Sequence, residues 1–354
     1  MKSILEKASE RIQDDRKTVL AAVKSDGLEL AYASARLQDN KEVVLAAVRN
    51  DGFSFLYASA RLKDNKELVL TGVRKYGLSL SCASARLKDD EEVVSEAVTT
   101  DGGALDNASE RFLDDKEMVL TSLESNNRNF WNVSERLQDD KEVVLAAVRN
   151  DGRSLEYASA RLQNDKEVVL TAVRKYGWSL EYASARLKDN KEVALAAVKT
   201  DVKALQHSSE RLQDHKEVVL VAVKSYCKSL RFASPRLKDD KEVVLVAIKK
   251  SKFSLSLASE KLRSDKEFIS QLKFSDVDVF KCCHSSIRKH KDIYLPALKK
   301  DPKLCRLFSE NDLLTLDFSS LSKESREIIY RSYKRRSKQK DIFLLAKAKR
   351  HFLS

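Results

Sequence analysis

A 25-residue motif recurs along most of this chain, and it limits the possible folds more than any other feature. The octapeptide Lys-Glu-Val-Val-Leu-Ala-Ala-Val begins at Lys41, returns unchanged at Lys141 and occurs in variant form in each of the other repeats. Full repeats start at residues 16, 41, 66, 91, 116, 141, 166, 191, 216 and 241, and positions 1 to 25 are counted from each start. Such a short repeat cannot bury its own apolar face, so neighbouring repeats must stack on one another.

The first ten positions of each repeat predict a helix. Their Val-Val-Leu-Ala-Ala-Val stretch is apolar nearly all round, which is typical of a helix packed between neighbours. Asp39 and Glu42 have the Asp-x-x-Glu spacing of a capping box, which places the start of the helix. Gly52 follows the helix, and we expect it to adopt the left-handed conformation that ends many helices.

The second half of the repeat predicts another helix. Leu155, Ala158, Ser159 and Leu162 have the i, i+3, i+4, i+7 spacing of one buried helical stripe, and strand alternation does not fit. Only 8 Gly and 3 Pro occur in 354 residues, which also favours helix over an all-β fold. The sequence therefore predicts an all-α fold, an α-solenoid of about twelve 25-residue helix-turn-helix repeats with a basic helical C-terminal end.

The repeat also suggests the domain organisation. A solenoid is expected over residues 1–265, as a half repeat at 1–15 followed by ten full repeats at 16–265. Residues 266–315 keep traces of the period and are expected to form degenerate repeats that cap the array. Residues 316–354 are expected to form a basic helical segment.

The repeated pattern resembles a known family. Lys-Glu-Val-Val-Leu-Ala-Ala-Val, Asp-Gly, Leu-x-x-Ala-Ser and Arg-Leu-x-Asp together are similar to a helical repeat of unknown function found in giant viruses, protists and bacteria that live inside eukaryotic cells. The resemblance covers roughly residues 1–265. It implies an α-helical repeat and a host-directed effector or interaction protein, and it implies no activity.

Two polar positions recur too regularly to form a catalytic site. Position 19 is Ser in the half repeat and in every full repeat, and position 21 is Arg in all of them except Lys261. A nucleophilic serine needs one base beside it, and these copies have no companion histidines. We expect the serine hydroxyl to return to a backbone carbonyl. We expect the arginines to pair with acids at the repeat junction, such as Asp39 and Glu42; a polyanion-binding arginine ladder is the alternative.

The variable positions 13, 16, 17 and 20 are better candidates for recognition. Large aromatic side chains and arginine are typical anchors of protein interfaces. The predicted partner-binding residues are Phe53, Tyr57, Trp131, Arg153, Tyr157, Trp178 and Tyr182. The alternative is that position 17 only borders the core and that the other positions vary freely.

Charge is distributed unevenly along the chain. Residues 1–240 hold 39 Lys and Arg against 40 Asp and Glu, whereas residues 241–354 hold 27 against 14. The balanced charge of the array argues against reading RNA one base per repeat, because phosphate neutralisation dominates such affinity. The basic end could bind nucleic acid or an anionic membrane surface, could be an import or secretion signal, or could simply be a capping helix. The predicted polyanion-binding residues are Lys334, Arg335, Arg336, Lys338, Lys340, Lys347, Lys349 and Arg350.

The cysteines do not have the spacing of a metal site. Cys282, Cys283, His284, His290 and Cys305 invite a zinc interpretation, but no CxxC pair is present, so buried free thiols are expected. Five Cys in 354 residues are not a disulfide framework, which favours a reducing, cytoplasmic compartment, with delivery into a host cell if the protein is a bacterial effector. No run approaches eighteen apolar residues, so no transmembrane segment is expected.

No catalytic motif is recognisable, and we expect neither a cofactor nor a metal. The sequence contains no Gly-rich phosphate loop and no H-E-x-x-H. We therefore predict a non-enzymatic protein–protein interaction scaffold, with polyanion binding through the basic C-terminal segment as the alternative.

Overall fold

The structure is a computed structural model, and it divides the chain into two compact bodies. It describes residues 4–125, 127–272, 277–336 and 342–353, with the backbone alone at 127–129 and 342–347. These residues form helices and no β-strand, which confirms the all-α solenoid. The N-terminal body comprises residues 1–187 and the C-terminal body residues 188–354.

Each repeat contains three helical segments where the sequence predicted two. Positions 1–10 form the expected α-helix, positions 12–17 form a 3₁₀-helix, and positions 20–23 form a short helix or turn. The predicted second helix is broken at position 18, where Ala158 is extended with φ −69° and ψ 150°. Ser at position 19 then caps a new helical turn, as the Leu62 N–H shows by donating to the Ser59 hydroxyl over 3.3 Å.

The N-terminal body contains seven long helices and their companions. The long helices are α2 (Arg16–Ser25), α4 (Lys41–Asn50), α6 (Lys66–Lys75), α8 (Glu91–Thr100), α9 (Lys116–Ser125), α11 (Lys141–Asn150) and α12 (Lys166–Lys175). The 3₁₀-helices of positions 12–17 are η1 (Gly27–Tyr32), η2 (Gly52–Tyr57), η3 (Gly77–Cys82), η4 (Gly102–Asn107), η6 (Asn127–Asn132), η7 (Gly152–Tyr157) and η8 (Gly177–Tyr182). The short segments are α1 (Glu10–Gln13), α3 (Ala35–Gln38), α5 (Ala60–Lys63), α7 (Ala85–Lys88), η5 (Glu110–Asp114) and α10 (Glu135–Gln138), with α13 (Ala185–Lys188) at the end of this body.

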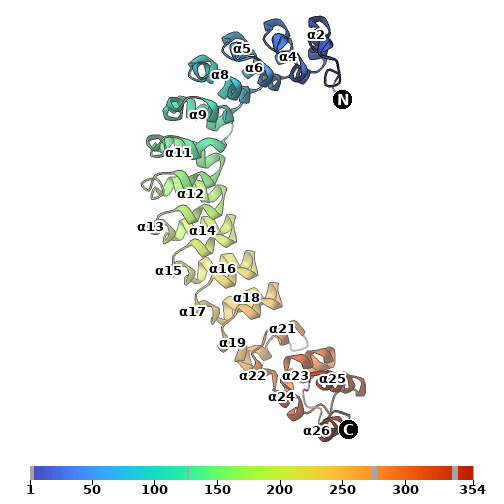
Figure 1. The fold of residues 1–354 in the computed structure, drawn as a ribbon. Coiled ribbons are helices and arrows are strands. Elements are labelled where there is room, and N and C mark those ends of the chain that lie inside the picture. Colours follow the sequence, from blue (N-terminus) through green and yellow to red (C-terminus); the bar gives the residue numbers. More distant parts are fainter. Residues whose placement is uncertain (1–3, 126, 273–276, 337–341, 354) are drawn as a thin grey trace. The chain divides into compact units, whose positions relative to one another are not determined.

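These elements stack in two parallel rows. Each long helix packs on the next, from α2 to α12, and each 3₁₀-helix packs on the next, from η1 to η8 (Figure 1). The core between the rows consists of the Val and Ala side chains of positions 3, 4, 7 and 8 together with the apolar residues of positions 15, 18 and 22. The half repeat covers the first end: Leu5 is buried, and the Glu29 carboxylate accepts from the Ile4 and Leu5 N–H groups over 2.7 and 2.8 Å.

The C-terminal body continues the same plan. Its long helices are α14 (Lys191–Thr200), α16 (Lys216–Ser225), α18 (Lys241–Lys250), the shorter α20 (Lys266–Ser270) and α23 (Lys291–Lys300). Positions 12–17 form η9 (Val202–His207), η10 (Cys227–Phe232), η11 (Lys252–Leu257), α21 (Val277–Cys282) and η12 (Pro302–Leu307). The short segments are α15 (Glu210–Gln213), α17 (Pro235–Lys238), α19 (Glu260–Ser264), α22 (Ser285–Arg288) and α24 (Glu310–Thr315). The three-segment plan therefore extends through the degenerate repeats.

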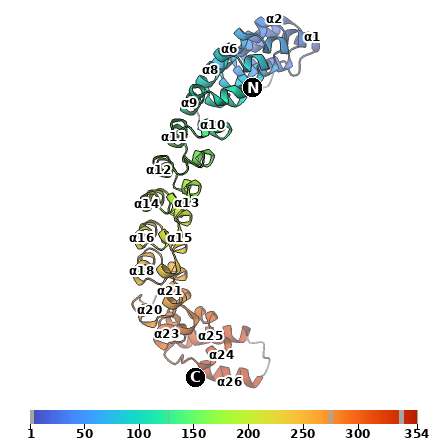
Figure 2. The same ribbon diagram turned by 90° about the vertical axis from the view of Figure 1, so that its left-hand side faces the viewer.

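Two helices follow the last repeat. They are α25 (Lys323–Arg336) and α26 (Ile342–Leu353), which lie side by side, and α25 packs against η12 (Figure 2). Ile329, Tyr333 and Phe352 are buried in this contact. The described part of the basic end thus forms two helices, of which α25 packs on the last repeat and α26 packs on α25.

A polar junction joins successive repeats. The carboxylate of Asp39, at position 24, accepts from the Ser59 hydroxyl and, over 3.1 Å, from Arg61 Nε of the next repeat. Arg61 Nη2 also donates to the Asp39 carbonyl over 2.8 Å, and the Ser59 N–H donates to the Gln38 carbonyl over 3.0 Å. The Arg–Asp pairing was predicted and is confirmed. The expected serine bond to a backbone carbonyl is wrong, because the hydroxyl donates to the carboxylate.

We call this arrangement of an acid or amide at position 24 with Ser and Arg of the next repeat the junction rung. In the N-terminal body the position-24 residues of the rungs are Asp14, Asp39, Asp64, Asp89, Asp114, Asp139 and Asn164. In the C-terminal body they are Asp189, Asp214 and Asp239, the last with Lys261 in place of Arg.

Two local expectations differ from the structure. The long helix is capped by position 25 and not by Asp39, since the Asn40 side chain accepts from the Glu42 and Val43 N–H groups over 3.1 and 3.2 Å. Asp39 belongs to the junction rung instead, and Glu42 forms an ion pair with Arg16. Gly52 does not have a positive φ. Glycine is needed there because a Cβ would lie 2.8 Å from the Tyr76 Cβ of the next repeat.

Candidate functional site

The 3₁₀-helices of the N-terminal body expose the predicted partner-binding residues. Their buried side presents positions 14 and 15 to the core, so positions 13, 16 and 17 face outward. Trp131 is 57% exposed and Phe53 is 53% exposed, and Arg153 and Tyr157 are also exposed. The other three predicted residues, Tyr57, Trp178 and Tyr182, are half-buried.

Five of the seven predicted residues lie on consecutive, mutually packed 3₁₀-helices. Trp131 is on η6, Arg153 and Tyr157 are on η7, and Trp178 and Tyr182 are on η8. We call these five side chains the aromatic patch. Tryptophan, tyrosine and arginine are the residue types that most often carry the affinity of protein interfaces, and here they lie on neighbouring 3₁₀-helices.

Phe53 and Tyr57 lie apart from the aromatic patch, on η2. Phe53 stacks against Tyr76, with ring centroids 3.9 Å apart. Tyr76 occupies position 11, which the sequence interpretation did not consider as exposed, and its counterpart Tyr176 lies under the Arg153 guanidinium at 5.7 Å. Both tyrosines replace the Asp that ends the long helix in other repeats, and this substitution could have marked position 11 as a further recognition position.

Acidic side chains border the aromatic patch and orient it. Trp178 Nε1 donates to the Glu181 carboxylate over 2.6 Å. Burial, followed by the charge of Glu156, raises the pKa of Tyr182. Burial also raises the pKa of Asp106, although Asn132 donates to its carboxylate over 2.6 Å. The patch therefore combines apolar rings with carboxylates, a surface suited to a partner with apolar and basic side chains.

The predicted polyanion-binding residues lie on or between the last two helices. Lys334 and Arg335 are exposed on α25, and Lys349 and Arg350 are exposed on α26. Arg336 is half-buried and donates to the Phe308 carbonyl over 2.6 Å. The predicted residues Lys338 and Lys340 lie outside the described residues, as does the side chain of Lys347.

The five cysteines are free thiols in two environments. Cys82 and Cys227 are half-buried, whereas Cys282, Cys283 and Cys305 are buried, which confirms the expected burial. Burial raises the pKa of Cys283 to about 12. Among the described residues no group of three or more His, Cys, Asp or Glu side chains is placed to hold a metal ion.

Thiol titration is expected to separate these two environments. In the folded protein we expect an aromatic disulfide reagent to modify the half-buried Cys82 and Cys227 within minutes and to spare the three buried thiols, because a thiolate must be accessible to attack it. All five thiols should react once the protein is unfolded in urea. Rapid modification of Cys283 in the folded protein, detected by peptide mass spectrometry, would contradict the packing of the degenerate repeats.

Comparison with known sequences agrees with the repeat. The family model "Domain of unknown function (DUF4116)" matches in overlapping copies at residues 15–63, 40–88, 65–113, 90–138, 115–163, 140–188, 165–213, 215–263 and 240–272. A search of curated proteins found no match, and neither did a search of solved structures. None of the described helices combines the length and the apolar composition required to cross a membrane. The matches cover most of the chain at the 25-residue period, and the chain therefore belongs to the DUF4116 family of helical-repeat proteins.

Proposed function

We propose that this protein is a non-enzymatic scaffold that binds a partner protein through the aromatic patch. The observation that supports this proposal is the exposure of Trp131, Arg153 and Tyr157, beside the half-buried Trp178 and Tyr182, on three consecutive 3₁₀-helices. Groups of exposed large aromatic side chains often mark sites of interaction with a partner. Solenoids commonly use such repeated surfaces to hold extended partners.

Replacing Trp131 and Trp178 by alanine is expected to weaken partner capture. One anchoring tryptophan typically contributes about 2 kcal/mol or more, so affinity should fall by at least about 30-fold even if only one of the two is an anchor. The measurement is quantitative mass spectrometry of proteins retained by the tagged full chain from a eukaryotic lysate treated with nuclease. Partners retained by the wild type and lost from the double variant are the expected result.

Phe253→Ala is a matched control for this experiment. Phe253 is an aromatic residue at position 13 of η11 in the C-terminal body, and it is as exposed as Phe53. The control should retain the same partners as the wild type. If the tryptophan double variant, with unchanged thermal stability, retains all of them as well, the proposal for this patch is wrong.

The proposal includes a reducing compartment. All five cysteines are free, which suits the cytoplasm better than an oxidising environment. The family resemblance further suggests delivery into a host cell, if the source is an intracellular bacterium. Both statements concern the setting in which the scaffold would act.

Polyanion binding by the basic C-terminal segment is the second candidate. It is favoured by the exposure of Lys334, Arg335, Lys349 and Arg350 on two docked helices. Binding of this kind releases counterions and weakens steeply with salt. A flat dependence of affinity for a single-stranded DNA oligonucleotide on salt concentration, measured with the full chain, would contradict this candidate.

A further inference from the structure

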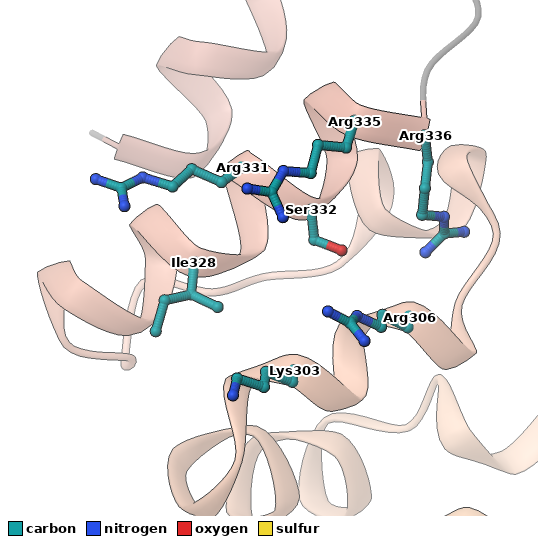
Figure 3. A pocket seen from close by; sticks show the side chains of 7 residues that line it. All are labelled: Lys303, Arg306, Ile328, Arg331, Ser332, Arg335 and Arg336. Carbon is teal, nitrogen blue, oxygen red and sulfur yellow. The ribbon is translucent and has the colours of Figure 1, made fainter.

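A groove in the C-terminal body gathers five cationic side chains between η12 and α25. It has a volume of about 410 Å³ and is lined by Lys303, Arg306, Ile328, Arg331, Ser332, Arg335 and Arg336 (Figure 3). This volume lies in the range of small-molecule sites. None of the described side chains that line the groove is acidic, and we call it the basic groove. Lys303 and Arg306 were not among the residues predicted from the sequence.

Buried side chains and two hydrogen bonds hold the frame of the basic groove. The apolar side of α25 is buried through Ile329 and Tyr333. On the groove side, Arg336 donates from Nη2 to the Phe308 carbonyl over 2.6 Å and from Nη1 to the Cys305 carbonyl over 3.4 Å. These bonds tie the end of α25 to η12. The two rows of cationic residues are therefore held facing each other before any ligand arrives, which lowers the entropy cost of binding.

The positive charge of the groove is only partly compensated within the protein. Arg331 pairs with Glu327 over 2.9 Å. Among the residues that the structure describes, no carboxylate lies within salt-bridge distance of Lys303, Arg306 or Arg335. Figure 3 shows Arg335 on α25 and Arg306 on η12, on opposite sides of the space between the two helices. Like charges held close together repel, and an anion between them removes that repulsion.

We propose that the basic groove binds a compact ligand that carries several phosphate groups. The inference deepens the second candidate function and rests on it. Arginine binds phosphate oxygens in a bidentate manner, so Arg306 and Arg335 are assigned to one phosphate between the helices. Lys303 contributes a point charge for a second phosphate.

The groove suits a small ligand better than a long nucleic acid. A nucleic acid would require a basic track along the chain, whereas residues 1–240 carry slightly more acidic than basic side chains. Ile328 also forms an apolar wall at the rim of the groove. A free polyphosphate and the phosphorylated headgroup of a lipid share the required chemistry.

Calorimetric titration of the full chain with sodium tripolyphosphate tests this inference. The double variant K303Q/R306Q is expected to bind at least about tenfold more weakly, because it removes two charge-assisted contacts to the phosphates. The control K224Q/K249Q removes the same charge from α16 and α18 of the same body, outside the groove and outside the basic segment, and should change the affinity by less than about threefold. All four side chains are exposed, so both variants are expected to fold.

A second arm of the experiment identifies the source of the phosphate. Vesicles of phosphatidylcholine with phosphatidylinositol bisphosphate are compared with vesicles of phosphatidylcholine and phosphatidylserine at equal charge. Groove-dependent binding to the first vesicles alone supports a lipid headgroup, and groove-dependent binding of tripolyphosphate alone supports a free ligand.

Two results would overturn the inference, and they can be told apart. If both double variants lose affinity for tripolyphosphate equally, the groove is not a site, while salt-dependent binding of the DNA oligonucleotide by the wild type keeps the second candidate function. If the wild type binds neither tripolyphosphate, nor the vesicles, nor the DNA oligonucleotide at low salt, the groove and the second candidate function both fail.

Discussion

Replacing Gly77 by alanine is expected to destabilise the N-terminal body by about 1–3 kcal/mol, although alanine is normally the better helix former. A Cβ at this position would lie 2.5 Å from the Ala97 carbonyl oxygen and 2.9 Å from the Asp101 nitrogen. Both atoms belong to the backbone at the end of α8. The two repeats would have to separate at this point, with loss of the surrounding packing.

Gly72→Ala is the matched control, with the opposite sign. Gly72 lies inside α6, and a Cβ there would meet its nearest neighbour, Val48 Cγ1, at 3.6 Å, which is an ordinary contact. Other repeats already carry alanine at this position. The substitution should stabilise the protein by about 0.5–1 kcal/mol, because alanine has less backbone entropy to lose on folding.

Urea unfolding and hydrogen exchange measure these effects. The denaturation midpoint should fall for Gly77→Ala and rise for Gly72→Ala. Exchange of the η3 and α8 amides should accelerate only in the first variant, since a solenoid responds to a local change at neighbouring repeats. If the Gly77→Ala variant is as stable as the wild type, the prediction is wrong, because the two repeats can then move apart without lowering the free energy of unfolding. Val202, half-buried at the equivalent position of η9, shows that the position tolerates a side chain in another repeat.

Acid is expected to destabilise the array progressively below about pH 4, near the ordinary pKa of aspartic acid. In each Asp rung the Ser hydroxyl of the next repeat, followed by its Arg or Lys, lowers the pKa of the position-24 carboxyl. The affected carboxyls are Asp14, Asp39, Asp64, Asp89, Asp114, Asp139, Asp189, Asp214 and Asp239. A lowered pKa in the folded state means that the stabilisation is present above the unfolded pKa and is lost as the pH falls through the folded pKa. Because the rung recurs, small individual effects add up.

The rung at residue 164 shows how a control variant without the charge can be made. Asn164 forms the same rung without a charge: its side-chain oxygen accepts from the Ser184 hydroxyl over 2.7 Å and from Arg186 Nε over 2.9 Å. A triple variant D39N/D64N/D139N should therefore be less stable than the wild type at pH 7. Its melting temperature should change less between pH 5 and pH 2.5, as measured by circular dichroism. Parallel pH profiles for the two proteins would exclude the rungs as the cause of acid sensitivity.

The sequence predicted the features that depend on periodic burial. The 25-residue period, the all-α class, the apolar core and the Arg61–Asp39 pairing follow from residue types that recur at fixed positions. The break inside the second predicted helix did not follow. Ala158 and Ser159 fit a helix as well as a turn, and the helical spacing of the apolar residues is satisfied in either case. Serine is also a strong helix-capping residue, and this was the neglected signal.

The remaining differences arise from contacts between repeats. Asp39 and Asn40 are both good caps, and only the bonds to Ser59 and Arg61 assign the aspartate to the junction. The need for glycine at residue 52 comes from the Tyr76 side chain of the next repeat. The basic groove likewise depends on the docking of α25 against η12, which joins residues far apart in the sequence. The residue pattern within one repeat carries no information about these contacts with neighbouring elements.

The junction rung has a consequence for the way in which such a chain changes its length. Its bonds join residues only 20 to 22 positions apart, so each repeat closes a loop of the same size as the one before. Gain or loss of one whole repeat within the array therefore brings together the same pair of complementary faces. The close match of the repeats at 41 and 66 with those at 141 and 166 is what duplication of a block of repeats would leave behind. The array can therefore become longer by duplication of its repeats, and each added repeat uses the interface that the others already have.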